Sequence, residues 1–476
     1  MKVGRSTAFK VVLIASLIIS ALNLSYMLKA LAYPYELDYS EGIYAFSTFS
    51  SLGDLYGTPS AAPYTLTYYP PLYYLINSFR SVVTTSDPYL YLRFMTLISL
   101  LADSVLIYLI SKNLAGAERG YSALAAILFL SIAYLTPALF SNPTVFELTF
   151  DLLALLLVGM KDRHAYLSAL SLSVAFFFKQ SALVMFVAIL LYLVVSRERR
   201  PLIQFAGTFA TVVLLVSIFL NFVTGGNFVF QTLLLPLITP ELWQNAIASW
   251  TMAAYFTLII PILFAATIGL RSKRLPLIAI ALVAEALSTL SIMKAGSSMV
   301  YLIPMVAVAC IASSIGMERI FSEKSSSLPY HLFFWLFIMF SLMEATAVIS
   351  TMSVFASTPA QETVGVWLRN VSGNVLVEDP GVALAANKPL VFEPSMLWVL
   401  EEHGLWNDSA IIAEIRDHDF GAIAYPSGGG RFSYYPDLIS TIKGSYNLTY
   451  YHDGWCIYTY GVVNGISRYV NASTAC

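Results

Sequence analysis

The chain has 476 residues, of which 58% are hydrophobic and only 11% are charged, and its mean hydropathy is +0.72. Soluble domains carry about 25% charged residues, so this composition excludes a wholly water-soluble protein. The formal net charge of −2 excludes the strongly basic field that nucleic-acid binding needs. We therefore predict an integral, multi-pass membrane protein whose solvent is largely the lipid bilayer and which has no nucleic-acid partner.

Eleven apolar stretches are long enough, or nearly long enough, to cross a bilayer. In chain order they cover residues 8–32, 89–111, 121–140, 144–160, 165–178, 180–196, 202–222, 250–270, 275–293, 298–316 and 330–352. Basic residues gather before the first stretch and after the even-numbered ones, at Lys2, Arg5, Lys10, Lys112, Arg119, Lys161, Arg163, Arg197, Arg199, Arg200, Arg271, Lys273, Arg274, Arg319 and Lys324. Because basic loops stay in the cytoplasm, this pattern predicts eleven spans with a cytoplasmic N-terminus and a C-terminus outside.

The first outer loop, residues 33–88, begins with a cluster of acids. Glu36, Asp38 and Glu41 stand within six residues directly after the first span. If a helix begins at Tyr39, Asp38 and Glu41 lie on one face at i and i+3. Such a pair could deprotonate an acceptor hydroxyl or hold a divalent cation. Acids beside a first span are also often ordinary solvated residues, and the spacing leaves both interpretations open.

Acids also occur inside the predicted spans. Glu147 and Asp151 are spaced i and i+4 in the fourth stretch. A carboxylate in hydrocarbon costs a few kcal/mol, so it should face a cavity or a hydrogen-bonding helix, and both alternatives stay open. For the remaining intramembrane acids we expect structural roles; these are Asp103, Glu285 and Glu344.

Residues 165–196 are expected to form a hairpin instead of one helix. A single helix would measure about 48 Å, too long for one crossing of about 30 Å, although both ends are flanked by basic residues. We predict two short helices that turn near Lys179 and Gln180 below the membrane surface, facing a water-filled cavity. Lys179 could neutralise a phosphate leaving group there, or it could extend to the surface.

The last part of the chain, residues 357–476, has ordinary polarity. The alternation in Asn374–Glu378 predicts a strand, Ala410–Arg416 a helix and Gly428–Gly430 a turn. We therefore predict a small α/β or α+β soluble domain outside the membrane, with residues 1–356 forming the transmembrane domain. Four Asn-x-Ser/Thr glycosylation sequons are consistent with a position outside the cytoplasm, and they begin at Asn370, Asn407, Asn447 and Asn471. Cys456 and Cys476 could pair in such a domain.

Several short motifs occur in one order along the chain. They are Glu36-Leu37-Asp38-Tyr39-Ser40-Glu41-Gly42, Tyr68-Tyr69-Pro70-Pro71-Leu72-Tyr73-Tyr74, Phe150-Asp151-Leu152-Leu153-Ala154-Leu155, Phe178-Lys179-Gln180-Ser181, Lys294-Ala295-Gly296-Ser297-Ser298 with Tyr301 and Pro304, and Glu378-Asp379-Pro380-Gly381. In this order the chain resembles the GT-C superfamily of polytopic glycosyltransferases. The nearest resemblance is to family 39-type, or dolichyl-phosphate-mannose-type, transferases, which are similar to protein O-mannosyltransferases and the lipid A aminoarabinose transferase.

The resemblance implies an α-helical GT-C bundle of about eleven transmembrane helices and an inverting glycosyltransferase. Its donor would be a polyprenyl-phosphate-linked sugar, used without a nucleotide sugar, and its acceptor a hydroxyl of a protein, lipid or glycan outside the membrane. Carried onto this sequence, Asp38 would be the general base, supported by Glu41 and Glu36, with Asp151 as a second cavity acid. The donor phosphate would bind Lys179, Gln180 and Lys294, and the substrate cavity would include Tyr39, Tyr69, Glu147 and Tyr301.

One departure from the family pattern concerns the acidic motif. Many relatives have Asp-Glu where this chain has Ser40-Glu41, so the identity of the base and the need for a cation at Asp38 and Glu41 stay open. Two other functions are alternatives: a secondary transporter or lipid flippase, and a non-catalytic GT-C-like assembly subunit. The enzymatic interpretation requires Asp38, Asp151 and Lys179 to meet around one lipid-accessible chamber.

Overall fold

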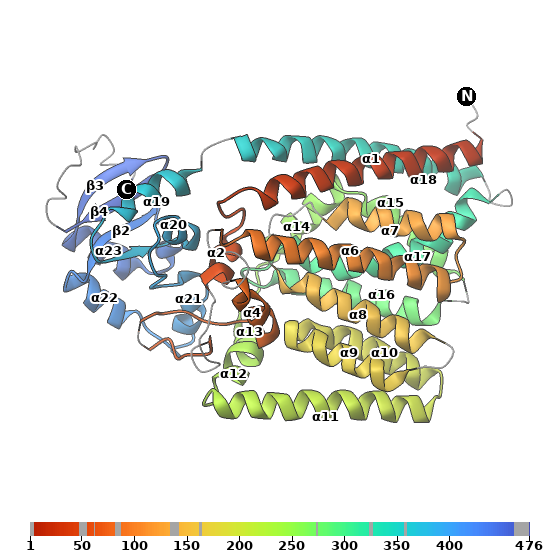
Figure 1. The fold of residues 1–476 in the computed structure, drawn as a ribbon, viewed down its shortest axis with the longest axis horizontal. Coiled ribbons are helices and arrows are strands. Elements are labelled where there is room, and N and C mark those ends of the chain that lie inside the picture. The colour runs from red at the N-terminus through yellow and green to blue at the C-terminus, as the bar shows by residue number, and fades with distance from the viewer. Residues whose placement is uncertain are drawn as a thin grey trace.

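The structure is a computed structural model that describes residues 4–46, 55–60, 62–80, 87–133, 142–160, 164–272, 275–322, 327–356, 359–460 and 476. A bundle of helices occupies one end of the molecule, and a smaller unit with a β-sheet lies at the other (Figure 1). This arrangement confirms the predicted fold class. Several predicted features lie outside the described residues, namely Lys2, Lys161, Arg163, Lys273, Arg274, Lys324 and the sequon at Asn471.

The bundle helices follow the predicted apolar stretches. They are α1 (Arg5–Leu31), α6 (Leu90–Asn113), α7 (Arg119–Ala133), α8 (Pro143–Gly159), α9 (Ala165–Phe178), α10 (Leu183–Val195), α11 (Arg199–Val223), α14 (Trp243–Phe256), α15 (Ile259–Leu270), α16 (Pro276–Ser288), α17 (Ile303–Phe321) and α18 (Ser327–Thr351). The 3-10 turns η4 (Thr289–Met293) and η5 (Met299–Leu302) extend α16 and α17, and η6 (Met352–Ala356) follows α18.

By length and composition, six helices of the described chain can each cross a membrane: α1, α6, α11, α16 with η4, η5 with α17, and α18. The bent pair α14–α15 raises this number to seven, and the other apolar helices are shorter. These helices make the chain an integral membrane protein. The count of eleven spans stays a prediction.

The predicted hairpin is confirmed. Helix α9 ends at Phe178, Lys179 is extended (φ −157°, ψ 135°), and the 3-10 turn η2 (Gln180–Ala182) leads into α10. The Phe178 ring stacks on Phe146 and Phe150 of α8, with centroid distances of 5.6 and 5.7 Å. This stacking fixes the hairpin turn beside α8.

The eighth stretch, residues 250–270, is not one continuous helix. It breaks at Thr257, where α14 and α15 meet at an angle of 86°. A break in hydrocarbon leaves backbone groups that water cannot satisfy. Glu344 of α18 accepts a hydrogen bond from the Leu258 backbone N–H at 2.9 Å, so this buried acid has the structural role expected for it.

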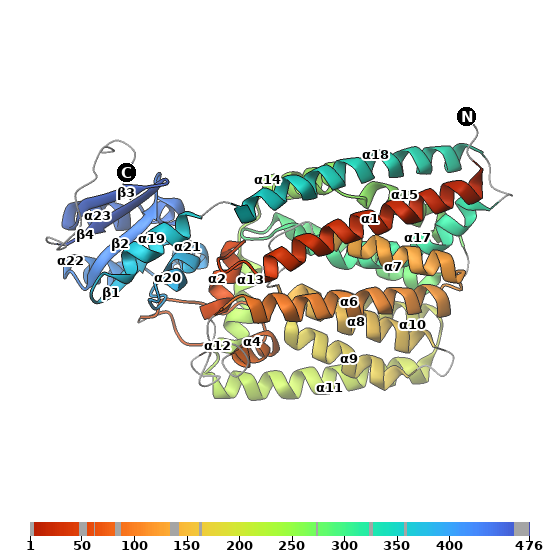
Figure 2. The same cartoon turned by 45° about the horizontal axis from the view of Figure 1, so that its top comes forward.

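Connections predicted to be cytoplasmic gather at one end of the bundle. Arg5 donates to the Ser322 carbonyl, and Arg319 donates to the Ile268 carbonyl at 3.2 Å. The Glu118 backbone N–H donates to the Glu318 carboxylate at 3.3 Å. The β-sheet unit lies at the opposite end (Figure 2). Which end faces the cytoplasm stays a prediction.

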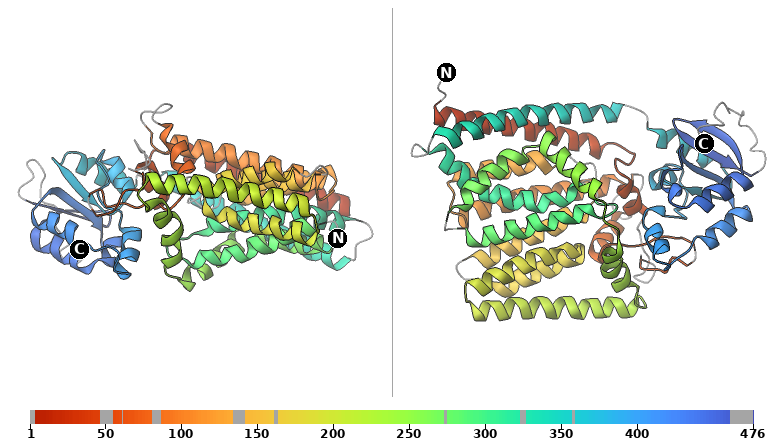
Figure 3. Two further views of the ribbon diagram at one scale, coloured as in Figure 1. Left: turned by 90° about the horizontal axis from the view of Figure 1, so that it is seen from below. Right: turned by 180° about the vertical axis from the view of Figure 1, so that it is seen from behind.

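Short elements lie between the bundle and the sheet unit (Figure 3). They are α2 (Tyr39–Phe46), α4 (Pro71–Ser78), α12 (Asn227–Val229), the π-helical turn η3 (Phe230–Leu234) and α13 (Leu235–Ile238). The Gln231 amide ties η3 to the first outer loop, because it donates to the Gly57 carbonyl and accepts from the Thr67 N–H, both at 2.8 Å.

The C-terminal unit contains α19 (Ala360–Arg369), β1 (Asn374–Val377), α20 (Pro380–Ala385), α21 (Pro394–Glu402), α22 (Ser409–Arg416), β2 (Phe420–Pro426), η7 (Gly430–Tyr434), α23 (Pro436–Ser445), β3 (Asn447–His452) and β4 (Trp455–Thr459). The sheet order is β1-β2-β4-β3, with β1 parallel to β2 and the other pairs antiparallel. Val375 and Val377 enter one hydrophobic core and Leu376 the other, so both faces of the sheet are covered. Cys456 and Cys476 form a disulfide.

Candidate active site

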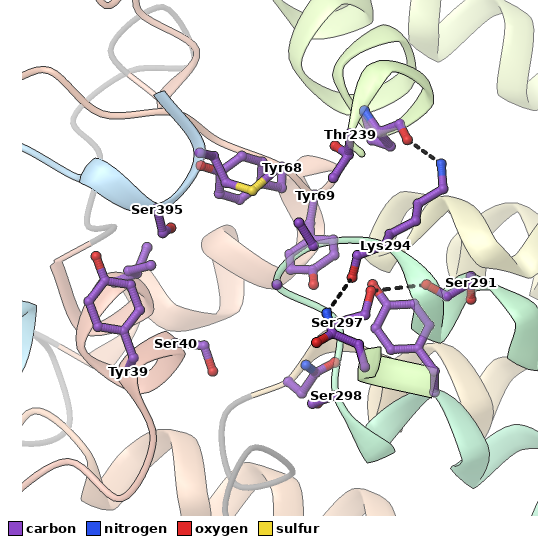
Figure 4. A pocket seen from close by; sticks show the side chains of 18 of the residues that line it. Tyr39, Ser40, Tyr68, Tyr69, Thr239, Ser291, Lys294, Ser297, Ser298 and Ser395 are labelled. Carbon is purple, nitrogen blue, oxygen red and sulfur yellow. Dashed lines mark hydrogen bonds between the residues drawn. The ribbon is translucent and has the colours of Figure 1, made fainter. Parts of the chain in front are cut away.

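A cavity of about 510 Å³ lies where the bundle, the first outer loop and the C-terminal unit meet. The first outer loop and α2 contribute Asp38, Tyr39, Ser40, Ile43, Tyr44, Tyr68 and Tyr69. The bundle side contributes Asn142, Gln180, Pro236, Thr239, Leu242, Asn245, Ser291, Lys294, Ala295, Gly296, Ser297, Ser298 and Tyr301. The C-terminal unit contributes Ser395, Met396, Trp398, Arg431 and Tyr434. Figure 4 shows Tyr39, Ser40 and Ser395 on one side and Lys294, Ser291 and Ser297 on the other.

Asp38 is the acid of the first outer loop that lines this cavity. It directly precedes α2, and its Oδ1 accepts hydrogen bonds from the Ser40 N–H at 3.0 Å and from the Ser40 hydroxyl. A carboxylate before a helix commonly caps it in this way. Among the described residues only Ser40 hydrogen-bonds this carboxylate, so its other oxygen can accept a proton from a ligand.

Glu41 does not join Asp38 in the cavity. Its two carboxylate oxygens accept from Nε and Nη2 of Arg93 at 2.8 and 2.7 Å, and both side chains are fully buried. The same guanidinium donates to the carbonyls of Ala30 and Tyr33, so it attaches the loop to the end of α1. Because Arg93 holds both Glu41 oxygens, the pair of Asp38 and Glu41 does not fit a shared divalent cation.

Glu36 also lies away from the cavity. Its side chain is packed between Gly42 of α2 and Gly381 of α20, where neither position has space for a Cβ. Burial raises the pKa of the Glu36 carboxyl well above its usual range, and the neighbouring Asp379 carboxylate raises it further. Glu36 therefore joins the first outer loop to the C-terminal unit, and the structure does not place it among the cavity acids.

Lys179 and the acids of α8 lie one layer behind the cavity wall. The Lys179 ammonium donates to the Thr144 hydroxyl at 2.6 Å and lies 3.9 Å from the ring centroid of Tyr301, which lines the cavity. Glu147 interacts electrostatically with Lys179, and Asp151 interacts with Glu147. Of the three groups predicted to meet around one chamber, Asp38 lines the cavity, whereas Lys179 lies behind the Tyr301 ring and Asp151 is not part of the lining.

Gln180 and Lys294 reach the cavity itself. The Gln180 amide donates to the Tyr68 carbonyl at 3.4 Å. The Lys294 ammonium donates to the Pro236 carbonyl (Figure 4), and no carboxylate of the described chain forms an ion pair with it. Gly296, with φ +77°, turns the loop back immediately after Lys294. Lys294 is thus a cation on the cavity surface whose charge is not neutralised by a described acid.

None of the residues that the C-terminal unit contributes to the cavity wall was predicted. Arg431 donates to Glu378 Oε1 at 2.9 Å, and its guanidinium lies 3.4 Å from the centroid of the Tyr39 ring. Burial raises the pKa of the Glu378 carboxyl, whereas the charge of Arg431 opposes that change. The predicted turn Gly428–Gly430 has positive φ at all three glycines and leads directly into Arg431. The turn was visible in the sequence, but the position of Arg431 against Tyr39 was not.

Glu393 of the C-terminal unit binds two of the tyrosines that line the cavity, Tyr39 and Tyr68. It is fully buried at the start of α21, where it accepts from the Ser395 N–H at 3.0 Å. Its carboxylate also accepts from the hydroxyls of Tyr39 at 3.2 Å and Tyr68 at 2.9 Å. Burial raises the pKa of both tyrosines well above the usual range, so they act as hydrogen-bond donors.

Comparisons with known proteins concern the fold of the chain. Residues 68–224 match the family model of dolichyl-phosphate-mannose-protein mannosyltransferases. No curated protein has a matching sequence. ArnT from Cupriavidus metallidurans bound to undecaprenyl phosphate has a similar structure, with a TM-score of 0.60 and 10% identity over 93% of this chain and 97% of that chain. The chain has the GT-C fold.

Two further GT-C structures support this assignment. The apo oligosaccharyltransferase of Archaeoglobus fulgidus matches with a TM-score of 0.57 and 11% identity over 89% of this chain and 70% of that one. The arabinofuranosyltransferase AftD from Mycobacteria matches with a TM-score of 0.50 and 13% identity over 97% of this chain and 42% of that one. These likenesses confirm the predicted GT-C fold.

The family match covers only part of the candidate site. It includes Tyr69, Glu147, Asp151, Lys179 and Gln180, which belong to the bundle side or to the end of the first outer loop. Asp38, Lys294 and Arg431 lie outside the matched segment. In this GT-C chain, their place in the site therefore rests on the cavity geometry.

Proposed function

We propose that the chain is an inverting glycosyltransferase that moves a sugar from a polyprenyl-phosphate donor to an acceptor hydroxyl on the non-cytoplasmic side of the membrane. The observation that carries this proposal is that one cavity is lined by an accessible carboxylate, Asp38, and by an unneutralised cation, Lys294. Transfer from a sugar phosphate asks for one base, one cation for the leaving group and exclusion of water.

In the proposed reaction, Asp38 accepts the proton of the acceptor hydroxyl. The acceptor oxygen then forms a bond to the anomeric carbon of the donor sugar from the face opposite the phosphate. The bond between that carbon and the phosphate oxygen breaks, and the electron pair leaves with the polyprenyl phosphate. Lys294 and Gln180 bind the departing phosphate, because a cation and an amide donor stabilise the charge that develops there.

The surroundings of the cavity suit a donor with an isoprenoid chain. Leu242 lines the cavity and is 39% exposed. Its neighbours Leu237 and Trp243 are exposed at 74% and 63%. Exposed apolar side chains at the edge of a membrane bundle can contact lipid. The isoprenoid chain would therefore stay in the bilayer while its phosphate reaches Lys294.

The proposed side of the reaction rests on two features at opposite ends of the molecule. The basic connections include Arg5 and Arg319, which lie at the end away from the cavity. The C-terminal unit carries the Cys456–Cys476 disulfide, and disulfides persist mainly in oxidising compartments. Both features support a cytoplasmic N-terminus and a cavity that opens outside.

The test is transfer by the purified full-length chain in liposomes that contain a polyprenyl-phosphate-linked sugar. Acceptors would be a panel of glycans, glycolipids and hydroxyl-bearing peptides, and the anomeric configuration of the product would be determined by NMR. We expect transfer with inversion, and we expect Asp38→Asn to lower the rate by about 10²- to 10⁴-fold, the range for loss of a general base. Asp417→Asn, at an exposed acid that is not part of the lining, is the matched control.

Full transfer by Asp38→Asn would reject Asp38 as the base, although the chain would still be a transferase. Movement of a fluorescent polyprenyl-phosphate lipid between leaflets without transfer to any acceptor would reject the transferase and favour the flippase. Failure of both activities in the folded protein would favour the non-catalytic subunit.

A further inference from the structure

We infer that the C-terminal wall of the cavity is a saccharide-binding subsite for the acceptor, built by Trp398, Tyr434 and Arg431. This inference rests on the proposed function and deepens it, because it names the chemical class of the acceptor. All three side chains line the cavity that contains Asp38. They come from α21 and from η7, two elements of the C-terminal unit.

Trp398 and Tyr434 form an aromatic surface at this wall. Their ring centroids lie 5.2 Å apart and their planes are tilted by 38°. Tyr434 is 53% exposed and Trp398 is half-buried. Trp398 packs against the hydrophobic core of the C-terminal unit, and both rings are accessible from the cavity. Aromatic rings combine a large apolar face with a polar edge. The C–H face of a sugar ring is a ligand that such a surface can bind.

Arg431 supplies hydrogen-bond donors beside this surface. A guanidinium has five N–H donors, and among the described residues only Glu378 accepts from the Arg431 side chain, through Nη1 at 2.9 Å. The same carboxylate neutralises the charge of Arg431. The remaining donors are therefore better suited to the hydroxyls of a neutral sugar than to a second anion.

The position of Arg431 places this subsite next to the proposed base. Its guanidinium stacks on Tyr39 at 3.4 Å, and Tyr39 directly follows Asp38 in the chain. Glu393 holds the Tyr39 hydroxyl from the same unit. A sugar on the C-terminal wall would thus present its hydroxyls toward the part of the loop that carries Asp38.

A peptide acceptor fits this wall less well. Extended peptides are commonly bound by pairing with the edge of a sheet, which supplies main-chain hydrogen bonds. None of the residues that line the cavity belongs to a strand of the described chain. The lining residues of the C-terminal unit all belong to the helical elements α21 and η7, and their largest side chains are aromatic.

Saccharide binding can be measured without the donor. The full-length chain in lipid nanodiscs would be mixed with methyl glycosides of mannose, glucose, galactose and N-acetylglucosamine, and contacts would be detected by saturation-transfer difference NMR. A serine-containing hexapeptide would be tested in parallel. We expect at least one glycoside to bind wild type, and we expect Tyr434→Ala and Trp398→Ala each to weaken that binding about 3- to 10-fold, as loss of an aromatic contact does. Tyr460→Ala, which removes a tyrosine of the same unit that is 60% exposed and outside the cavity lining, should have no effect.

The outcomes separate this inference from the proposed function. Wild-type protein that binds no glycoside, or Tyr434→Ala and Trp398→Ala variants that bind as tightly as Tyr460→Ala, would overturn the subsite. Binding of the hexapeptide without binding of any glycoside would assign the wall to a protein acceptor instead. Binding of polyprenyl phosphate, measured by native mass spectrometry on the same samples, should stay unchanged in both aromatic variants. If the wild-type protein does not bind polyprenyl phosphate, the proposed donor site is rejected. The saccharide subsite would then be judged on glycoside binding alone.

Discussion

The two walls of the cavity carry their positive charges in different ways. On the bundle side, Lys294 donates to a neutral carbonyl, that of Pro236. On the C-terminal side, Arg431 is paired with the carboxylate of Glu378. A cation that is not paired with a carboxylate attracts an anion. A guanidinium that is paired with one keeps its hydrogen-bond donors but has little net charge. The difference suggests that the phosphate of the donor goes to the bundle wall and the neutral acceptor goes to the other.

The first outer loop connects the two walls, and its acids have separate tasks. Glu41 is bound by Arg93 on the bundle side, whereas Glu36 packs against Gly381 on the C-terminal side. Asp38 lies between them and faces the cavity. Neighbouring carboxylates of one motif therefore differ by environment: two are buried and structural, and one is accessible.

The largest expected effect comes from breaking the bundle-side attachment of this loop. Glu41→Ala leaves the Arg93 charge buried without its partner, which typically costs about 3–5 kcal/mol. We expect the thermal unfolding midpoint to fall and transfer to be lost with it. The double variant Glu41→Leu with Arg93→Met should recover most of the stability, because it removes both charges. An unchanged midpoint for Glu41→Ala would show that this ion pair does not hold the loop.

The next effect concerns the bundle wall. Lys294→Gln removes a charged hydrogen bond to phosphate, worth about 1.5–3 kcal/mol, so we expect polyprenyl phosphate to bind roughly 10- to 100-fold more weakly. The measurement is native mass spectrometry or a filter-binding assay in nanodiscs. Lys443→Gln, at an exposed lysine of α23, serves as the control. Equal affinity in both variants would assign the phosphate to another cation.

A smaller effect is expected at the contact between loop and C-terminal unit. Because burial raises the pKa of Glu36 above its ordinary value of 4.5, the folded chain holds a proton that the unfolded chain releases. Stability from this group is therefore present at low pH and is lost as the pH rises above 4.5. Glu36→Gln should flatten the fall of the unfolding midpoint as the pH rises above 4.5. The exposed Glu402→Gln should keep the wild-type profile, and a profile of Glu36→Gln that matches wild type would contradict the assignment.

The smallest effect tests the charge balance of the C-terminal wall. Glu378→Gln keeps an oxygen acceptor for Arg431 but leaves its charge unneutralised. We expect methyl glucuronide to bind about threefold more tightly than to wild type, a typical gain for a partly exposed charge pair. Binding of the neutral methyl glucoside should not change and is the internal control. Equal changes for both sugars would mean that charge does not distinguish the two walls.

Amino-acid patterns alone predict the membrane character, the hairpin and much of the C-terminal secondary structure. Hydropathy marks the helices because lipid requires long apolar runs, and the length of residues 165–196 required the turn at Lys179. The alternation in Asn374–Val377 predicted β1, because successive side chains of a strand point to opposite faces of a sheet. The order of motifs was enough to predict the GT-C fold.

Which polar groups share the cavity depends on how the chain folds in three dimensions. The sequence could not reveal that Arg93 would hold Glu41, since the two are 52 residues apart, nor that Tyr301 would cover Lys179. It also could not show that Arg431 would lie on the Tyr39 ring, or that Trp398 and Tyr434 would line the same cavity as Asp38. A local sequence pattern indicates whether a segment faces lipid or water and whether it forms a helix or a strand. The pairing of charges and aromatic rings depends instead on contacts between residues far apart in the chain. Those contacts, and not the spacing of the acids, made Asp38 the carboxylate that faces the cavity.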